Sequence, residues 1–203
     1  MSELNKEIKN VEYDNIIYSI NEKEKTASVI CSNGNDHSLF IPKLIKHESE
    51  EYLITSISEN AFYKSFIESI QFPIDSELKT IEKNAFNESD IRTLTIPSKL
   101  TELKEGWCNN TKQLYQISVN PENKKYFCID DQIIIGKSSI ENNEYDELLF
   151  CTRNTTIVKL PDYIKHIRSF AFQRCKSLRR ILISQNSQLQ TIGKKSFSET
   201  PIK

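Results

Sequence analysis

The chain has few of the residues that most enzyme motifs require. Its 203 residues include only four glycines and three histidines. Four scattered glycines do not make a phosphate-binding loop. His37, His47 and His166 form no His-Glu-x-x-His motif and stand beside no nucleophile motif. The sequence therefore argues against an enzyme, with cysteine–histidine catalysis as the remaining enzymatic alternative, and we assign no catalytic, cofactor-binding or metal-binding residue.

Long apolar runs are absent as well. The mean hydropathy is −0.51, and no stretch has the roughly 20 apolar residues of a membrane-spanning helix. The first fifteen residues, MSELNKEIKNVEYDN, are polar and have no apolar core. We therefore expect no ordinary signal peptide and no transmembrane segment.

The cysteines do not follow a metal-binding or disulfide-framework pattern. Five are present, an odd number, without a Cys-x-x-Cys pair or zinc-ligand spacing. We interpret them as buried or partly buried free thiols, because cysteine behaves as a small hydrophobic residue. A disulfide between neighbouring repeats is the alternative. The five are Cys31, Cys108, Cys128, Cys151 and Cys175.

What the chain does contain is an internal repeat with an aromatic motif. Four segments share the pattern Ile-x-x-x-Ala/Ser-Phe, and Leu103–Trp107 looks like a copy one residue shorter, with tryptophan in place of phenylalanine. The distance from Phe62 to Phe86 is 24 residues. The four full copies are Ile57–Phe62, Ile81–Phe86, Ile167–Phe172 and Ile192–Phe197.

A second motif repeats with the same spacing. It is a short β-like run of apolar, variable and apolar residues, followed by proline or a polar residue, and Pro73 and Pro97 are 24 residues apart. Alternation places every second side chain on one face of a strand. The six copies are Leu39–Pro42, Ile70–Pro73, Leu94–Pro97, Ile117–Asn120, Val158–Pro161 and Ile181–Ser184. We expect inward side chains at Ile70, Phe72, Leu94, Ile96, Ile117, Val119, Ile181 and Ile183.

A period in the low twenties predicts a leucine-rich-repeat solenoid with one strand and one short helical or 3₁₀ turn per coil. Stacked coils share a continuous core that one coil cannot form alone. Hydrophobic residues make up only 37% of the chain, which suits a thin solenoid. The predicted fold class is an α/β repeat, a right-handed solenoid with a parallel β-sheet.

The two motifs together resemble the BspA-like leucine-rich-repeat family, from about Val11 to the end of the chain. In that family a small polar or cysteine position often follows the aromatic residue. Ser65, Ser89, Asn110, Cys175 and Thr200 fit it here. The resemblance implies a microbial or parasitic-protist surface antigen or adhesin, located at the cell surface, that binds proteins or glycans of a host or neighbouring cell.

The predicted organisation is an N-terminal β cap over residues 1–45 and a solenoid over residues 46–203. Residues 1–10 are expected to be a frayed start or short helix, and 46–51 a hydrophilic connection. The cap contains an antiparallel hairpin of Ile16–Ile20 and Thr26–Ile30. Residues 123–154 are predicted as a β-hairpin insertion, because 41 residues separate Asn120 from Pro161. Its strand candidates are Tyr126–Ile129, Gln132–Ile135 and Leu148–Cys151.

The outward strand positions are the candidate partner-binding residues. Stacked in register, they would make a ribbon of short polar groups that becomes basic toward the C-terminus, with a solvated sheet face as the alternative. One row is Ser69, Thr93, Gln116 and Arg180, and the next is Gln71, Thr95, Ser118, Lys159 and Leu182.

Charge is distributed unevenly along the chain. Residues 156–203 carry ten Lys or Arg and two acidic residues, which gives +8, so residues 1–155 sum to −9 for the net charge of −1. The cluster Arg174, Lys176, Arg179 and Arg180 could meet a sulfated glycan, an acidic protein or phospholipid headgroups. Nucleic acid is not expected, because no aromatic platform is interleaved with these charges.

The function predicted from the sequence is non-enzymatic macromolecular interaction, without a cofactor. An intracellular scaffold for protein–protein interaction is the rival, favoured by the polar N-terminus and the free thiols. Asn87, Asn109 and Asn154 begin glycosylation sequons that matter only in a secretory lumen.

Overall fold

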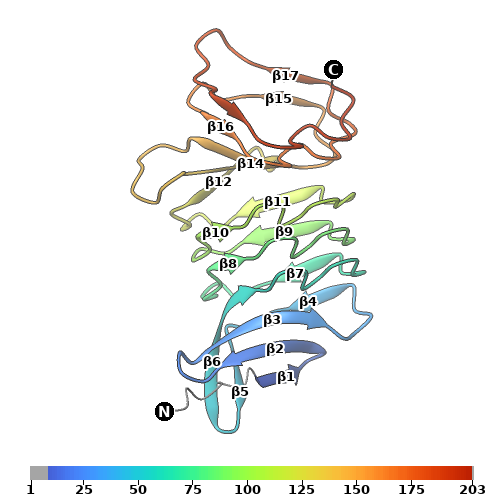
Figure 1. Ribbon diagram of the computed structural model, residues 1–203, viewed down its shortest axis with the longest axis vertical. Coiled ribbons are helices and arrows are strands. Elements are labelled where there is room, and N and C mark those ends of the chain that lie inside the picture. Colours follow the sequence, from blue (N-terminus) through green and yellow to red (C-terminus); the bar gives the residue numbers. More distant parts are fainter. Residues whose placement is uncertain (1–8, 203) are drawn as a thin grey trace, which may run out of the picture.

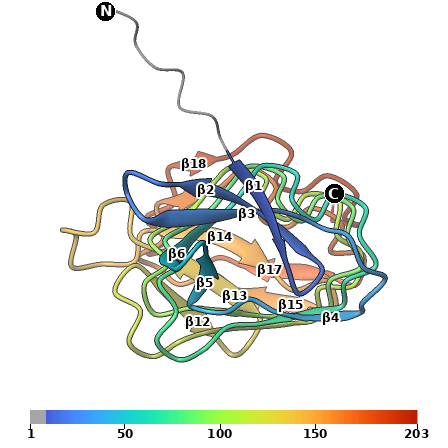
Figure 2. The same cartoon turned by 90° about the horizontal axis from the view of Figure 1, so that it is seen from below.

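The computed structural model describes residues 9–202, which form an elongated β-solenoid of about seven turns. In Figure 1 the coils stack along the long axis, with β1 (Lys9–Tyr13) near one end and β17 (Arg180–Leu182) near the other. Figure 2 views the same stack along this axis. The predicted leucine-rich-repeat solenoid with parallel sheets is confirmed. The start expected over residues 1–10 lies mostly outside the described residues, and Lys9 and Asn10 belong to β1.

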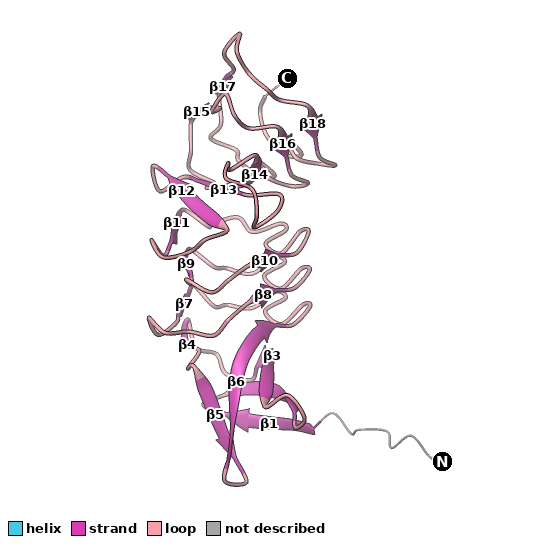
Figure 3. Cartoon of the chain, turned by 90° about the vertical axis from the view of Figure 1, so that its left-hand side faces the viewer, coloured by secondary structure: helices cyan, strands magenta, loops and turns pink. Residues whose placement is uncertain are grey.

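Two walls of the first half of the solenoid are sheets, which lie on opposite sides of the stack in Figure 3. The first wall contains, after β1, the strands β2 (Ile16–Asn21), β3 (Thr26–Ser32), β6 (Glu50–Ile57), β8 (Thr80–Ile81) and β10 (Glu102–Leu103), with β5 (Leu44–His47) paired to β6. The second wall contains β4 (Ser38–Phe40), β7 (Ser69–Gln71), β9 (Thr93–Ile96) and β11 (Gln116–Val119).

The second half repeats this arrangement after an antiparallel segment. One sheet runs through β12 (Tyr126–Ile129), β13 (Ile133–Gly136), β14 (Glu147–Cys151), β16 (His166–Ile167) and β18 (Thr191–Ile192). A two-stranded sheet pairs β15 (Ile157–Lys159) with β17. All six predicted repeat strands are therefore present, each beginning one residue before its expected start.

The N-terminal strands change the pairing from antiparallel to parallel. β1 with β2 and β2 with β3 are antiparallel, and β3 then pairs in parallel with β6 of the first coil. The expectation of a plain connection over residues 46–51 is wrong, because β5 and β6 form a hairpin there. Its turn residues Glu48 and Ser49 have φ values of 50° and 68°, as a tight turn between antiparallel strands requires.

The α in the predicted α/β class is wrong, since residues 9–202 contain no helix. Each regular coil has two residues with positive φ, four positions apart. A right-handed helix does not tolerate positive φ at such positions. In the first coil these are Asn60 (59°) and Lys64 (54°). Between them, the Phe62 N–H donates to the Ala85 carbonyl of the next coil at 2.8 Å rather than along its own chain. Corresponding pairs are Asn84 and Glu88, Gly106 and Asn110, Phe170 and Arg174, and Lys195 and Glu199.

The hydrogen-bond register also corrects the alignment of one coil. The Phe86 N–H donates to Trp107 O at 2.8 Å, as Phe62 does to Ala85, so Trp107 stands at the alanine position and Cys108 at the phenylalanine position. Gly106, with φ 70°, takes the place of Asn84. The small polar position then falls on Thr111 rather than on the predicted Asn110.

Aromatic rings form two files inside the solenoid. Phe62 stacks on Phe86 with centroids 5.2 Å apart, and Trp107 follows at 6.1 Å and Phe150 at 5.7 Å. In the second half, Phe172 stacks on Phe197 at 5.0 Å. The apolar side chains divide in the same way into two clusters.

Strands β13 and β14 separate the two cores. Ile134 and Phe150 face the first cluster, whereas Ile133, Ile135 and Leu148 face the second. Both faces of this pair are therefore buried, and burial on both faces explains the continuous apolar run in β13.

Most of the predicted inward side chains of the repeat strands are buried, and one prediction is wrong. Ile70, Leu94, Ile96 and Ile117 are at most 4% exposed. Phe72, Val119 and Ile181 are partly buried. Ile183 was expected to point inward but is 55% exposed. It follows β17, which has a neighbouring strand on one side only among residues 9–202.

Candidate interaction surfaces

The second wall displays the predicted polar rows, which we call the ribbon: the outward side chains of β4, β7, β9 and β11. Strand register places Ser38, Ser69, Thr93 and Gln116 in one row. Hydroxyl groups connect neighbours within rows, with Ser69 Oγ donating to Ser38 Oγ at 2.9 Å. In the adjacent row Thr95 and Ser118 are joined at 2.9 Å, and Gln71 is exposed.

The ribbon does not continue in register to the C-terminal coils, contrary to the expectation. Lys159 and Leu182 are paired on the separate sheet of β15 and β17, where Arg180 lies opposite Ile157. β12 and β13 contact β11 and intervene between the two sheets. The break arises because the segment after β11 pairs antiparallel, so the parallel ladder stops at β11.

The predicted basic cluster is divided as well. Lys176, Arg179 and Arg180 are exposed. Arg174 is instead held on the turn side of its coil, where its guanidinium pairs with Glu199 at 3.2 Å and bonds to Asn110 Oδ1 at 3.4 Å. Arg174 therefore serves coil packing more than it serves an open cationic surface.

The sequence reasoning missed a charged row along one edge of the ribbon. Glu68, directly before β7, pairs with Arg92 at 2.9 Å and with His37 at 3.4 Å. Tyr115, 45% exposed, directly precedes β11 as these residues precede their strands, whereas Phe40, 55% exposed, lies at the other end of β4 beside Gln71. The signal was present in the sequence, because each charged residue immediately precedes a repeat strand.

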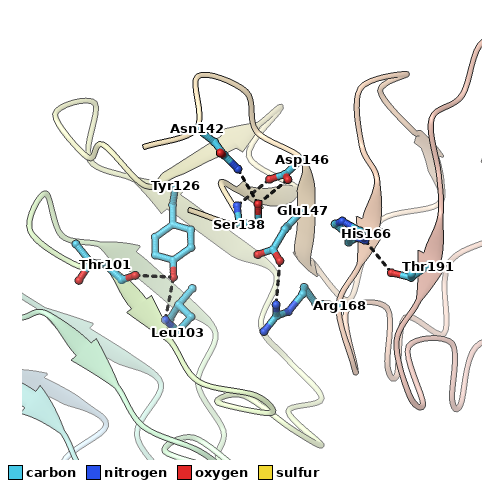
Figure 4. A network of polar contacts seen from close by, with 10 residues as sticks. All are labelled: Thr101, Leu103, Tyr126, Ser138, Asn142, Asp146, Glu147, His166, Arg168 and Thr191. Carbon is cyan, nitrogen blue, oxygen red and sulfur yellow. Dashed lines mark hydrogen bonds and ion pairs between the residues drawn. The ribbon is translucent and has the colours of Figure 1, made fainter. Parts of the chain in front are cut away.

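A junction between the two halves of the solenoid was also missed. Within residues 9–202, β10 pairs with β8 on one side only, and Tyr126 covers its other edge (Figure 4). The Leu103 N–H donates to the Tyr126 hydroxyl at 2.9 Å, and that hydroxyl donates to Thr101 O at 3.2 Å. Buried Asn123 positions the tyrosine by accepting from its N–H at 2.8 Å. Burial raises the pKa of Tyr126 to about 12.

Replacing Tyr126 with phenylalanine is expected to lower the free energy of unfolding by about 1–3 kcal/mol, because the Leu103 N–H and Thr101 carbonyl lose a buried partner. Urea unfolding followed by circular dichroism measures the change. Tyr115→Phe is the matched control, since Tyr115 is 45% exposed. A loss no larger than that of the control would contradict the assignment of Tyr126 as the edge cover.

Beyond Tyr126 the junction carries further polar contacts, drawn in Figure 4. Asp146 accepts from the Ser138 N–H at 2.7 Å and from its hydroxyl at 2.6 Å. Burial alone would raise the pKa of Asp146, but the Ser138 hydrogen bonds outweigh it and lower the pKa. Arg168 pairs with Glu147 at 2.9 Å. The Ser138 bonds therefore hold the hairpin connection together, and the Arg168–Glu147 pair joins the hairpin to the next coil.

Arg153 joins the two halves inside the core and is 3% exposed. Its Nε and Nη2 donate to Thr111 O and Oγ1, both at 3.2 Å, across 42 residues of sequence. Its Nη1 donates to Cys151 O at 3.2 Å, and its guanidinium carbon lies 4.6 Å from the Phe150 ring centroid. The planar guanidinium with several donors suits such a set of neutral partners.

Three buried thiols surround Arg153. Burial raises the pKa of Cys108 to about 12. The neighbouring Cys151 thiol and the Arg153 guanidinium, whose Nη1 donates to Cys175 Sγ at 3.6 Å, lower the pKa of Cys175. All five cysteines are free and buried or partly buried, as interpreted from the sequence. Cys108 and Cys151 share one repeat position, the aromatic one, which the sequence alignment did not reveal.

Comparison with known families agrees with this geometry. Six copies of the BspA-type leucine-rich repeat match the chain over residues 43–140 and 126–203. The chain belongs to the BspA-type leucine-rich repeat family. Repeat proteins of this BspA type are suited to protein–protein interaction. No curated protein matches the chain.

Solved structures similar to this BspA-type chain are bacterial. A leucine-rich repeat protein from Eubacterium ventriosum has 15% identity and a TM-score of 0.62, over 92% of this chain and 62% of its own. A leucine rich cell surface protein from Faecalibacterium prausnitzii has 14% identity and a TM-score of 0.46, over 95% and 77%. The pneumococcal vaccine antigen PcpA has 16% and 0.48, over 95% and 68%. The Eubacterium likeness supports the solenoid fold.

Within residues 9–202, no helix has the length and apolar character needed to cross a membrane. Across the same part of the chain, no group of three His, Cys, Asp or Glu side chains could hold a metal ion.

Proposed function

We propose that this protein is a non-enzymatic interaction protein of a cell surface, an antigen or adhesin that binds proteins or glycans of a host or neighbouring cell. The ribbon is the observation that supports the proposal. It presents short polar side chains in register over four parallel strands. An extended face of this kind is the usual binding surface of solenoid proteins.

The chemistry of the ribbon suits a protein partner. Ser69, Thr93, Thr95 and Ser118 offer hydroxyl groups that can both donate and accept. Exposed aromatic side chains at Phe40 and Tyr115 add apolar area, and such residues are enriched at protein interfaces. A protein strand or loop laid across the four strands could use both kinds of contact.

The basic end adds an anionic component to the proposed partner. Lys176, Arg179 and Arg180 are exposed, and residues 156–203 carry a charge of +8. Such a concentration of charge steers anionic partners toward one end of the molecule. A sulfated glycan or an acidic protein is the class proposed for this end, and nucleic acid and cofactors are outside the proposal.

Heparin chromatography tests the basic end, with heparin as the sulfated-glycan probe. Changing Arg179 and Arg180 to glutamate should move elution to clearly lower salt. Fewer positive charges then attract the sulfates, so less salt is needed to screen the attraction that remains. The control changes two exposed lysines outside this region, Lys23 and Lys79, to glutamate, which alters the net charge equally. Equal shifts for both double variants would remove the basic end as a specific site.

An intracellular scaffold with the same binding mode is the second candidate. Its support is the set of five free thiols, since structural disulfides are rare in reducing compartments. Labelling of intact cells with a membrane-impermeant amine reagent separates the two candidates. Labelled protein supports the surface location, whereas labelling that needs lysed cells supports the scaffold.

We propose the same division of the chain as the sequence suggested: a β cap over 1–45, a solenoid over 46–203 and a hairpin insertion over 123–154. Antiparallel pairing of β1 to β3 and of β12 to β14 supports it. Limited proteolysis of the purified chain, followed by mass measurement of the stable fragments, tests these boundaries.

A further inference from the structure

One coil lacks a loop that the other regular coils have. Strand pairing aligns Leu148 with Ile167, and the Cys151 N–H donates to Ala171 O at 2.9 Å, so Cys151 stands at the position of Phe172. Only residues 149 and 150 lie between Leu148 and Cys151, whereas the four residues 168–171 lie between Ile167 and Phe172 in the next coil. The loop of the β14 coil is therefore two residues shorter. No residue of β14 has positive φ.

The missing loop leaves a cavity, which we call the loop gap. Its volume is about 370 Å³, and it lies between residues 103–109 on one side and 166–170 on the other. Glu147 and Leu149 of β14 line it between the two. The volume falls within the lower part of the range found for ligand sites. Figure 4 shows Glu147 and Arg168 between Leu103 of β10 and His166 of β16.

Backbone groups on both sides of the loop gap match those that a coil loop would use. In two of the other coils the N–H of the first positive-φ residue donates to the next coil. Asn60 donates to Lys83 O at 3.4 Å, and Phe170 to Lys194 O at 3.2 Å. Beside the gap, Gly106 is the first positive-φ residue of its coil, so its N–H faces the place of the missing loop. On the other side, Ser169 precedes Phe170 as Lys83 precedes Asn84, so its carbonyl is the acceptor that the missing loop would use. A peptide unit supplies the complementary acceptor and donor.

Side chains around the loop gap also favour a neutral ligand with hydrogen-bonding groups. The Asn109 amide donates to Asn84 Oδ1 at 3.3 Å, while Asn109 Oδ1 is buried without a hydrogen-bond partner among residues 9–202. Glu147 and Arg168 neutralise each other at 2.9 Å.

We propose that the loop gap binds a peptide turn from a partner protein, which takes the place of the missing loop. Backbone hydrogen bonds to the Gly106 N–H and the Ser169 carbonyl hold the turn, and Asn109 Oδ1 accepts a further N–H. Main-chain hydrogen bonding is a common way to recognise peptides with little dependence on their sequence. This site is on a different wall from the ribbon, so it does not depend on ribbon binding.

Amide chemical shifts of the full chain, titrated with a capped hexapeptide Ile-Glu-Lys-Asn-Ala-Phe, test the proposal. The probe copies Ile81–Phe86, a loop that stacks on its neighbours in this solenoid. Saturable shifts are expected at Gly106, Asn109 and Ser169, and none at Thr95 of the ribbon. Cellotetraose is titrated in parallel, and the same shifts with the sugar but not the peptide would overturn the proposal in favour of a glycan.

Two blocking variants make the test specific. Insertion of Asn-Gly between Leu149 and Phe150 restores the loop length and should weaken peptide binding at least tenfold. Ser169→Trp fills the loop gap from the opposite side and should also weaken peptide binding. This variant keeps the test valid if the insertion disturbs folding. Glu59→Trp is the control, because Glu59 holds the position of Ser169 in an unbroken pair of coils. Peptide binding that survives Ser169→Trp, or no binding by the unmodified chain, would overturn the proposal.

Discussion

Replacing Phe86 with alanine is expected to lower the free energy of unfolding by about 3–5 kcal/mol, the cost of removing a large ring from a packed core. Phe86 is fully buried between Phe62, at 5.2 Å between ring centroids, and Trp107, at 6.1 Å. Alanine would leave a gap between two rings that cannot move together, because backbone hydrogen bonds fix the spacing of the coils. Urea unfolding followed by circular dichroism gives the change in free energy.

Phe66→Ala is the control for this measurement. Phe66 belongs to the preceding coil but is 64% exposed, so its removal should change stability by no more than about 0.5 kcal/mol. The comparison separates burial in the aromatic file from a general effect of losing phenylalanine. If both variants lost the same amount, the aromatic file would not be a main source of stability.

The repeating parts of this fold could be predicted because they are encoded locally. Alternation in runs such as Leu94–Ile96 defines both the strand and its buried face, and proline at 97 marks its end. The 24-residue spacing of Phe62 and Phe86 then requires them to meet in adjacent coils, and they stack. Each of these inferences needs only one coil and its period.

The conformation of the turn wall could not be predicted from the same pattern. An Ile-x-x-x-Ala-Phe segment is compatible with a short helix, and its apolar residues fit either structure. Neighbouring coils decide the outcome, because they offer carbonyl groups such as Ala85 O to the Phe62 N–H. The asparagines at positions 60 and 84 were the available signal, since asparagine tolerates positive φ better than most residues.

The candidate sites could likewise be predicted only where the local repeat pattern determines them. The rows of the ribbon followed from register, which the period supplies. Its interruption after β11 did not, because it depends on antiparallel pairing between segments that share no repeat. The loop gap was beyond sequence reasoning for a similar reason. It arises where residues 103–109 and 166–170 face each other across a shortened coil, and these segments are far apart in the chain.

Replacing Phe150 with alanine is expected both to destabilise the protein by about 3–5 kcal/mol and to separate its unfolding into two transitions. Phe150 is 1% exposed and is the last ring of the first aromatic file, 5.7 Å from Trp107. It also lies under the Arg153 guanidinium, which is bonded to Thr111 of one half and to Cys151 of the other. Solenoid stability depends on interfaces between neighbouring coils, so weakening one interface uncouples the parts on either side.

The single tryptophan makes this uncoupling measurable. Trp107 belongs to the first core, so its fluorescence reports that half, whereas circular dichroism reports both. The two signals should follow one urea transition in the unmodified chain and separate in Phe150→Ala. Phe127→Ala is the control, because Phe127 lies in the same antiparallel segment and is 53% exposed. Coincident transitions in Phe150→Ala would mean that contacts other than the Phe150–Arg153 pair, such as the hydrogen bonds between Asn110 and Gln173, are sufficient to couple the two cores.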